Sequence, residues 1–275
     1  MRLRQSGVAP PIRPARPEAG GPAIGDDWAV DLGLNGKACV VTGASRGIGL
    51  ATTRLLEAEG VSVLAVSRSG DGFAADVTDP GAAEQIAGEC ERRFGRFDVL
   101  VNNAGTSQAK PLDELTDADW QVQWELHVMA PMRLMRAAGE AMGEGGRIVN
   151  VCSSSGKRPS LTNVAYSVTK AAQLSLSRHF ADAYAGRGIL VNAVAPGPVE
   201  TPLWTEEGGL ADPAAQAKGI SREEALEAAA AKIPLGRFGT EEEIAATIVF
   251  LCSERASNVT GASWSVDGGA VPLFI

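Results

Sequence analysis

The chain has 275 residues, of which 45% are hydrophobic and 21% are charged, with a net charge of −8. This composition is typical of a folded globular protein, and the length suits one large domain or two small ones. The negative charge disfavours nonspecific binding to nucleic acid, and no apolar run approaches the roughly 18 residues of a membrane span. We therefore expect neither nucleic acid nor a membrane as a partner.

The first 29 residues differ from the rest of the chain, because they are rich in arginine and proline and lack a periodic apolar pattern. Such a segment buries too little surface to offset the entropy of ordering it. It also lacks the continuous apolar core of a secretory signal. We expect a disordered N-terminal extension over 1–29 and one folded domain over 30–275.

Four cysteines and two histidines occur in the whole chain, without a C-x-x-C pair. This pattern is not that of a zinc site, so we expect no metal. Cys39 and Cys152 lie inside apolar runs, which is typical of buried thiols in a reducing compartment. We expect a cytoplasmic protein.

Short apolar runs rich in β-branched residues alternate with longer amphipathic stretches from Lys37 onward. The runs predict strands at Ala38–Thr42, Ser62–Val66, Val99–Asn102, Ile148–Val151, Leu190–Val194 and Ser263–Val266. The stretches between them predict helices at Gly47–Glu59, Ala82–Phe94, Asp117–Met142, Val164–Tyr184 and Glu241–Cys252.

Nearly continuous apolar strands that alternate with helices indicate an α/β fold with a parallel sheet covered on both faces. We expect a single doubly wound Rossmann domain with a seven-stranded parallel sheet, whose ligands bind at the carboxyl ends of the strands. The stretch 68–75 is too short for a crossover helix, so the usual third connection is expected to be a loop. The stretch 198–239 is expected to form a lid with a helix at Arg222–Ala231.

A glycine-rich turn follows the first expected strand and reads Thr42-Gly43-Ala44-Ser45-Arg46-Gly47-Ile48-Gly49. Its glycines remove side chains where the backbone must turn tightly and approach a phosphate. The helix that begins there offers unpaired N–H groups and the positive end of its dipole. The turn therefore predicts a dinucleotide site, although its G-x-x-x-G-x-G spacing differs from the commoner G-x-G-x-x-G.

Further motifs follow in register: Asn102-Asn103-Ala104-Gly105, Ser153 thirteen residues before Tyr166, the Y-x-x-x-K pair Tyr166 and Lys170, Pro196-Gly197-Pro198-Val199-Glu200-Thr201, and Asp267-Gly268-Gly269. With these motifs the sequence resembles the short-chain dehydrogenases/reductases over roughly residues 31–270. The resemblance implies hydride transfer between a bound nicotinamide dinucleotide and a ketone or secondary alcohol. Within the family it is most similar to the 3-oxoacyl-[acyl-carrier-protein] reductase type, so a 3-oxoacyl thioester is one candidate substrate.

The chemistry of the tyrosine–lysine pair follows from its spacing. Tyr166 and Lys170 are four residues apart on an expected helix and so share one face. A nearby ammonium is expected to lower the pKa of the phenol toward the working range of a general acid–base group. Ser153, after the fifth strand, is expected to hydrogen-bond the substrate oxygen, with Ser155 as the alternative. The resemblance implies that Lys170 also binds the nicotinamide ribose.

His127 stands where members of the family usually have an asparagine that completes a catalytic tetrad. One interpretation is that His127 substitutes in the proton relay or merely packs. The other is that it titrates near neutral pH and adds a pH dependence of its own.

The end of the second strand reads Val66-Ser67-Arg68 and has no acid to bind a ribose 2′-hydroxyl. Arg46 and Arg68 suit a 2′-phosphate, which predicts a preference for NADP(H) over NAD(H). Asp76 and Val77 resemble the adenine-binding pair of the family, and Val199 and Thr201 resemble its contacts to the carboxamide. The full expected cofactor site is Gly43, Ser45, Arg46, Gly47, Ile48, Gly49, Ser67, Arg68, Asp76, Val77, Asn103, Ala104, Gly105, Tyr166, Lys170, Pro196, Gly197, Val199 and Thr201.

The substrate is less well encoded than the cofactor. Leu203, Trp204, Leu210 and Ile220 in the expected lid indicate an apolar component, or simply pack the lid. Lys157 and Arg158, just beyond Ser153, are either contacts to an anionic group or surface charge. We expect a small-molecule carbonyl or alcohol substrate. We also expect a homo-oligomer, either a tetramer or a dimer, because the long helices expected at Asp117–Met142 and Val164–Tyr184 resemble those that pair between subunits in the family. The alternative is a nucleotide-binding regulatory protein with little turnover.

Overall fold

Seven parallel strands form one sheet in the order β3-β2-β1-β4-β5-β6-β7 in the computed structural model, which describes residues 30–107, 109–160 and 162–272. The expected extension over 1–29 lies outside the described residues. The strands are β1 (Ala38–Thr42), β2 (Ser62–Ser67), β3 (Phe73–Ala74), β4 (Val99–Asn102), β5 (Arg147–Val151), β6 (Leu190–Pro196) and β7 (Ser263–Val266). The parallel α/β sheet predicted from the sequence is confirmed, and a loop joins β2 to the two-residue β3.

The helices between the strands match the amphipathic stretches, apart from a four-residue helix at Ser154–Lys157 and the differences described below. They are α1 (Gly47–Ala58), α2 (Ala82–Phe94), α3 (Asp117–Trp124), α4 (Ala130–Ala141), α5 (Ser154–Lys157), α6 (Val164–Tyr184), α7 (Pro202–Thr205), α8 (Ala211–Lys218), α9 (Arg222–Ala230) and α10 (Glu241–Cys252).

Alternate residues of each central strand point to opposite faces of the sheet, which creates two cores. Val40, Leu100 and Ile148 are in register on neighbouring strands and contribute to one core, together with Ile86 of α2. Their neighbours Val41 and Val101 contribute to the other core. Because both faces are buried, the strands contain continuous apolar runs instead of an alternating pattern.

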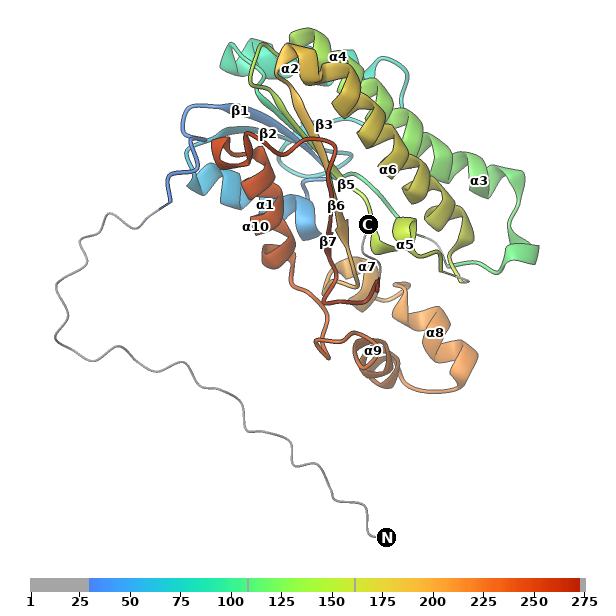
Figure 1. The fold of residues 1–275 in the computed structure, drawn as a ribbon. Coiled ribbons are helices and arrows are strands. Elements are labelled where there is room, and N and C mark those ends of the chain that lie inside the picture. Colours follow the sequence, from blue (N-terminus) through green and yellow to red (C-terminus); the bar gives the residue numbers. More distant parts are fainter. Residues whose placement is uncertain (1–29, 108, 161, 273–275) are drawn as a thin grey trace, which may run out of the picture. The chain divides into compact units, whose positions relative to one another are not determined.

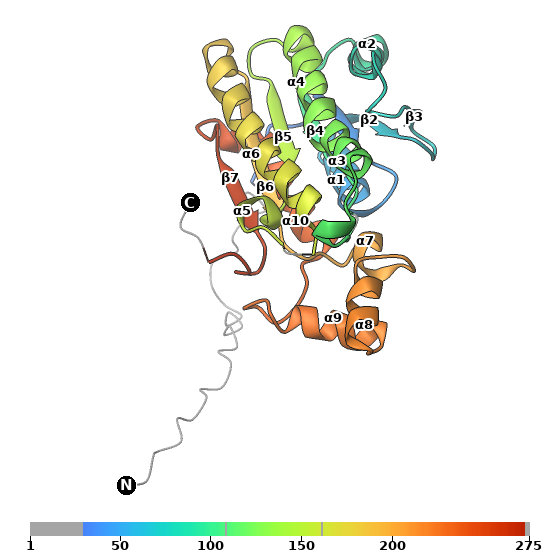
Figure 2. The ribbon, with the colours of Figure 1, turned by 90° about the vertical axis from the view of Figure 1, so that its right-hand side faces the viewer.

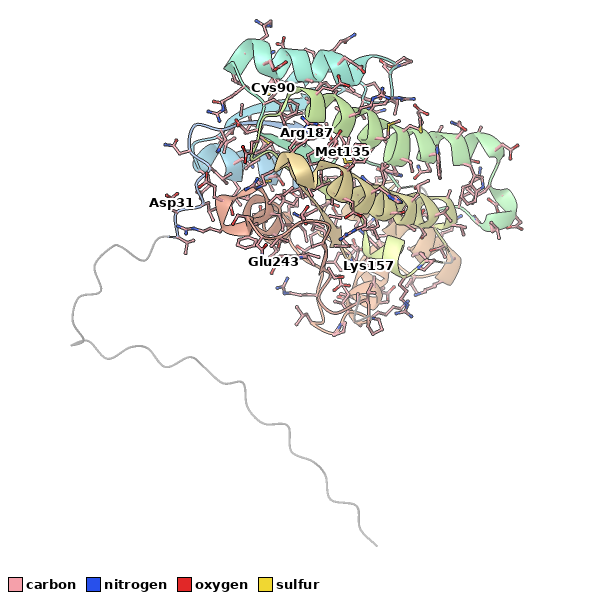
Figure 3. All side chains as sticks on the ribbon, turned by 45° about the horizontal axis from the view of Figure 1, so that its top comes forward. Asp31, Cys90, Met135, Lys157, Arg187 and Glu243 are labelled. Carbon is pink, nitrogen blue, oxygen red and sulfur yellow. The ribbon has the colours of Figure 1, made fainter. Side chains whose placement is uncertain are left out.

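One layer of helices covers each face. Figure 1 shows α2, α4 and α6 on one side of the sheet and α1 and α10 on the other, where these two pack against each other. Cys90 of α2 and Met135 of α4, both labelled in Figure 3, are fully buried in the first layer. This two-faced arrangement leaves the carboxyl ends of β1 and β4 open, at the point where the strand order reverses.

The sequence predicts one helix over 117–142, and the structure divides it. Between α3 and α4 lies a π-helical turn over Glu125–Met129. Pro131 stands in the first turn of α4 and has no N–H, so the α-helical bond from residue 131 to the carbonyl of His127 cannot form. A π turn widens the helix locally and is often found at functional sites.

The segment 198–239 contains more helix than the sequence predicts. Besides α9, which matches the expected helix, it forms the short α7 and the two-turn α8. Figure 2 shows α8 and α9 beside each other beyond the carboxyl ends of the strands. These helices add a wall to the open end of the sheet. No helix of the described part of the chain is both long and apolar enough to span a bilayer.

Candidate active site

One cleft of about 1610 Å³ runs along the carboxyl ends of the strands, from the glycine-rich turn to α8 and α9. It contains every predicted site residue except Gly49 and His127: Gly43, Ser45, Arg46, Gly47, Ile48, Ser67, Arg68, Asp76, Val77, Asn103, Ala104, Gly105, Ser153, Tyr166, Lys170, Pro196, Gly197, Val199 and Thr201 all line it. Gly49 lies beneath the turn, and His127 is fully buried behind the lining.

The glycine-rich turn has a backbone that its glycines make possible. Gly43 and Gly47 have φ angles of +66° and +63°, in the left-handed region that side chains disfavour. A Cβ atom at Gly49 would lie 2.2 Å from the carbonyl oxygen of Gly43, so only glycine fits there. The first turn of α1 has neither an acidic side chain nor a side-chain cap. These features form a cradle with free backbone donors, which suits a diphosphate.

Asn103 ties this turn to the end of β4. Its side-chain nitrogen donates to the carbonyl oxygens of Thr42 and Gly43, at 2.9 and 3.2 Å. In return, the Thr42 hydroxyl oxygen accepts from the backbone N–H groups of Asn103 and Ala104. The Thr42 hydroxyl also donates to the carbonyl of Val101, so five side-chain hydrogen bonds hold together the two strand ends on either side of the switch point.

The two arginines expected at a 2′-phosphate have different surroundings. Arg46 forms an ion pair with Glu206 of the lid, at 3.0 Å, so its guanidinium has a partner that the sequence did not reveal. Arg68 is exposed at the end of β2, and no ion pair is formed by it within the described chain. Asp76 accepts hydrogen bonds from the backbone and hydroxyl of Thr78, which lower the pKa of its carboxyl.

Tyr166, Lys170 and Ser153 meet at the floor of the cleft. The Ser153 side chain acts on the Tyr166 phenol and lowers its pKa, and Ser153 also caps α5 by accepting from the Ser155 N–H at 3.0 Å. The Lys170 ammonium donates to the carbonyl of Val151 and to Oε1 of Gln173, both at 2.9 Å, and lies 5.7 Å from the centre of the Tyr166 ring.

The expected effect of Lys170 on the phenol is wrong for this structure. Burial raises the pKa of Tyr166 to about 12, and the hydrogen bond with Ser153 offsets only part of that rise. Burial also lowers the pKa of Lys170 to about 8. The reason is desolvation, which disfavours each charged form, while the ammonium is bonded to neutral acceptors and not to the phenol oxygen.

His127 is buried in the π turn between α3 and α4. Its Nδ1 lies 3.2 Å from the hydroxyl of Thr169, and its Nε2 accepts from the backbone N–H of Thr106 at 3.4 Å. Burial, and secondarily the charge of Lys170, hold the pKa of His127 well below its usual range. This contradicts the interpretation that His127 titrates near neutral pH.

Of the apolar lid residues, Leu203, Trp204 and Leu210 line the cleft, whereas Ile220 does not. Lys157, labelled in Figure 3, does not line it either: its ammonium donates to the carbonyl of Ser263 and the hydroxyl of Ser265, so it anchors β7. Sequence reasoning missed the cleft residue Asn163 and the partners Thr169 and Gln173. Their spacing of three residues from Tyr166 or Lys170 could have indicated them.

Comparisons with known proteins identify the family to which this geometry belongs. A family model described as enoyl-(acyl carrier protein) reductase matches residues 43–271. The 3-oxoacyl-[acyl-carrier-protein] reductase of Thermotoga maritima is 36% identical over 259 residues, which cover 86% of this chain and 99% of that protein. The chain belongs to the short-chain dehydrogenase/reductase family.

Other short-chain dehydrogenases/reductases similar to this chain act on different molecules. D-threitol dehydrogenase of Mycolicibacterium smegmatis is 34% identical, with 87% of this chain and 94% of that protein covered. The structure of L-sorbose reductase from Gluconobacter frateurii with NADPH and L-sorbose is 34% identical, with a TM-score of 0.82 and 89% of this chain and 100% of that chain covered. As a short-chain dehydrogenase/reductase, this chain is an oxidoreductase that acts on CH–OH or C=O groups with a nicotinamide cofactor.

Proposed function

We propose that this enzyme transfers hydride between NADP(H) and a ketone or secondary alcohol, with Tyr166 as the proton donor and acceptor. The single observation that carries the proposal is that Tyr166, Ser153 and Lys170 line the same cleft as the glycine-rich cradle. Two adjacent hydroxyls beside a dinucleotide site are what carbonyl reduction requires: one group gives the proton and the other holds the oxygen.

The residues of the cleft fit a dinucleotide, because a Cβ at Gly49 would collide with the backbone of the turn and the N-terminus of α1 has no side-chain cap. The diphosphate would lie at Ser45, Gly47 and Ile48, and the nicotinamide end would meet Lys170, Val199 and Thr201. When bound, the cofactor supplies or accepts the hydride at the reacting carbon.

The protein's own residues handle the proton. With a pKa of about 12, the phenol of Tyr166 stays protonated at pH 7 and can give its proton to a ketone oxygen. Ser153 can donate a hydrogen bond to the same oxygen as negative charge develops. Lys170, with a pKa of about 8, is mostly cationic at pH 7, and its ammonium is held by the Val151 carbonyl and Gln173.

We further propose a preference for NADP(H), with Arg68 as the main contact to the 2′-phosphate. Its support is the exposed guanidinium, which lines the cleft directly after β2, at a strand end that has no acid among residues 66–68. Arg68→Ala should raise the KM for NADPH by about 10- to 100-fold, the effect of losing one charge-assisted hydrogen bond, and leave NADH unaffected. Arg54→Ala, on α1 away from the cleft, is the matched control. Equal loss with both cofactors would contradict the assignment.

A panel of candidate carbonyl substrates can narrow the substrate class. The wall formed by Leu203, Trp204 and Leu210 is apolar, whereas Ser155 and Asn163 beside Tyr166 are polar. The similarity to the Thermotoga reductase favours a 3-oxoacyl thioester, and the similarity to L-sorbose reductase favours a ketose. A panel with both classes, assayed by oxidation of NADPH, separates them.

The decisive experiment pairs turnover with binding. The wild type should oxidise NADPH in the presence of at least one panel ketone, and Tyr166→Phe should bind NADPH normally but lose most of its turnover. NADPH binding without turnover of any ketone would refute the proposal and favour the regulatory alternative.

We also propose that the enzyme is a homo-oligomer in the cytoplasm. Trp124 of α3 and Val168 of α6 expose 40% and 46% of their surface, and Trp264 stacks on Phe250 at the β7 edge of the sheet, where it is 37% exposed. The four free, buried cysteines suit a reducing compartment. Light scattering should give the mass of a dimer or tetramer, and a monomeric mass would refute the oligomer.

A further inference from the structure

His127 lies within a continuous chain of hydrogen bonds that joins two residues lining the cleft, Thr106 and Tyr166. Nε2 can only accept from the Thr106 N–H, so the ring proton must lie on Nδ1. Nδ1–H then donates to the hydroxyl oxygen of Thr169, at 3.2 Å. That hydroxyl in turn donates to the main-chain carbonyl of Tyr166, at 3.0 Å. All three bonds have a consistent direction from donor to acceptor only in the neutral Nδ1–H tautomer.

Packing fixes the same ring against the catalytic tyrosine. The imidazole meets the Tyr166 ring edge-on, with centroids 5.3 Å apart and planes at 86°. Gly105 also approaches the ring, because a Cβ atom there would lie only 3.3 Å from Nε2. The ring is fully buried, and the π turn that carries it places it between the loop after β4 and the first turns of α6.

We propose that His127 is a positioning residue: its neutral Nδ1–H tautomer couples the cleft loop at Thr106 to the main chain of Tyr166 through Thr169, and so sets the orientation of the phenol. This inference rests on the proposed role of Tyr166 as proton donor. His127 does not line the cleft, so it does not contact the reacting atoms. The titratable groups that face it are Lys170 and Tyr166, both from α6.

A direct test of the tautomer does not depend on activity. The chain has two histidines, so ¹⁵N-histidine labelling gives two imidazole spin systems, and the His179→Asn variant assigns them. The signal of His127 should show protonated Nδ1 and unprotonated Nε2, unchanged from pH 6 to pH 9. An Nε2–H tautomer, or a ring that titrates in this range, would overturn the proposal even if the enzyme reduces ketones.

Thr169 offers a matched pair of variants. Thr169→Val keeps the shape of the side chain but removes the hydroxyl that links His127 to Tyr166, whereas Thr169→Ser keeps the hydroxyl. Thr169→Val should lower kcat by about tenfold, the worth of one net hydrogen bond, with the KM for NADPH unchanged, and should mix the two His127 tautomers in the NMR spectrum. Thr169→Ser should retain wild-type kcat and a single tautomer.

The outcomes separate the two proposals. If the wild type reduces no ketone, the proposed function fails, while the tautomer measurement still tests the chain of hydrogen bonds. If turnover is present and Thr169→Val matches Thr169→Ser in both kcat and tautomer, the positioning role is refuted. If Thr169→Val raises the KM for NADPH without changing kcat, Thr169 supports the cofactor site instead, which also overturns the role proposed for His127.

Discussion

Replacing Lys170 by methionine should make the protein more stable at neutral pH while it removes turnover. The ammonium is buried, with 3% of the residue exposed, and its hydrogen-bond acceptors are the neutral oxygens of Val151 and Gln173. Burial lowers the pKa of Lys170 to about 8, so the folded state holds the proton less tightly than the unfolded chain does. The charged ammonium of Lys170 therefore destabilises the folded state at pH 7.

The magnitude follows from the pKa difference. Between the folded value of about 8 and the ordinary value of 10.5 lie about 2.5 pH units, which correspond to about 3 kcal/mol of destabilisation below pH 8. From pH 8 to 10.5 the unfolded chain binds more protons than the folded one, so this destabilisation disappears as the pH rises. Methionine leaves two acceptors without a donor, which costs about 1 kcal/mol each at every pH. The net gain at pH 7 is then about 1 kcal/mol.

Urea unfolding of Lys170→Met and the wild type at pH 7, 8, 9 and 10 measures the effect. Between pH 7 and pH 10 the unfolding free energy of Lys170→Met relative to the wild type should fall by about 2.5 kcal/mol, while contributions from shared groups cancel. Lys218→Met, which replaces an exposed lysine of α8, is the control and should show a flat difference. A difference for Lys170→Met that is also independent of pH would refute the reasoning.

Two other predictions concern packing and thiol chemistry. Gly49→Ala should abolish NADPH binding or folding, because its Cβ would lie 2.2 Å from a backbone oxygen. Gly88→Ala in α2 is the control, because its Cβ would meet no atom within 4 Å. It should stabilise the protein by about 0.5–1 kcal/mol, measured by thermal unfolding. Cys152 and Cys252, whose pKa burial raises to about 12, should resist alkylation by iodoacetamide at pH 8 in the native state and react in urea; rapid native modification of either would contradict their burial.

The parts of the fold that the sequence predicts depend on local patterns. Val99–Asn102 and its neighbours are continuous apolar runs, and such runs predict buried parallel strands with boundaries correct to within two residues. Because parallel strands end at one edge of a sheet, the order of strands and motifs along the chain is enough to place the glycine turn, Ser153 and Thr201 in one cleft. In each case the information lies within a short window of the chain.

The parts that could not be predicted depend on contacts between distant segments. The π turn over Glu125–Met129 interrupts a stretch with good helical periodicity, and Pro131 alone does not say whether the helix ends, kinks or widens. The helix α8 has no side-chain cap and is rich in alanine, so its sequence carries little periodic signal. The ion pair of Arg46 with Glu206 joins residues 160 positions apart.

The same limit explains why the predicted electrostatics of the tyrosine–lysine pair were wrong although the pair itself was found. A spacing of four residues predicts that Tyr166 and Lys170 share a helix face, but the pKa of each group depends on what surrounds it. Burial raises the pKa of Tyr166, lowers that of Lys170 and lowers that of His127, so one cause moves all three toward their neutral forms. At pH 7, Lys170 is then the cation among the three, and the phenol of Tyr166 is protonated. Ketone reduction needs this protonated phenol as a proton donor. Alcohol oxidation needs the phenolate, so the phenol must first lose its proton.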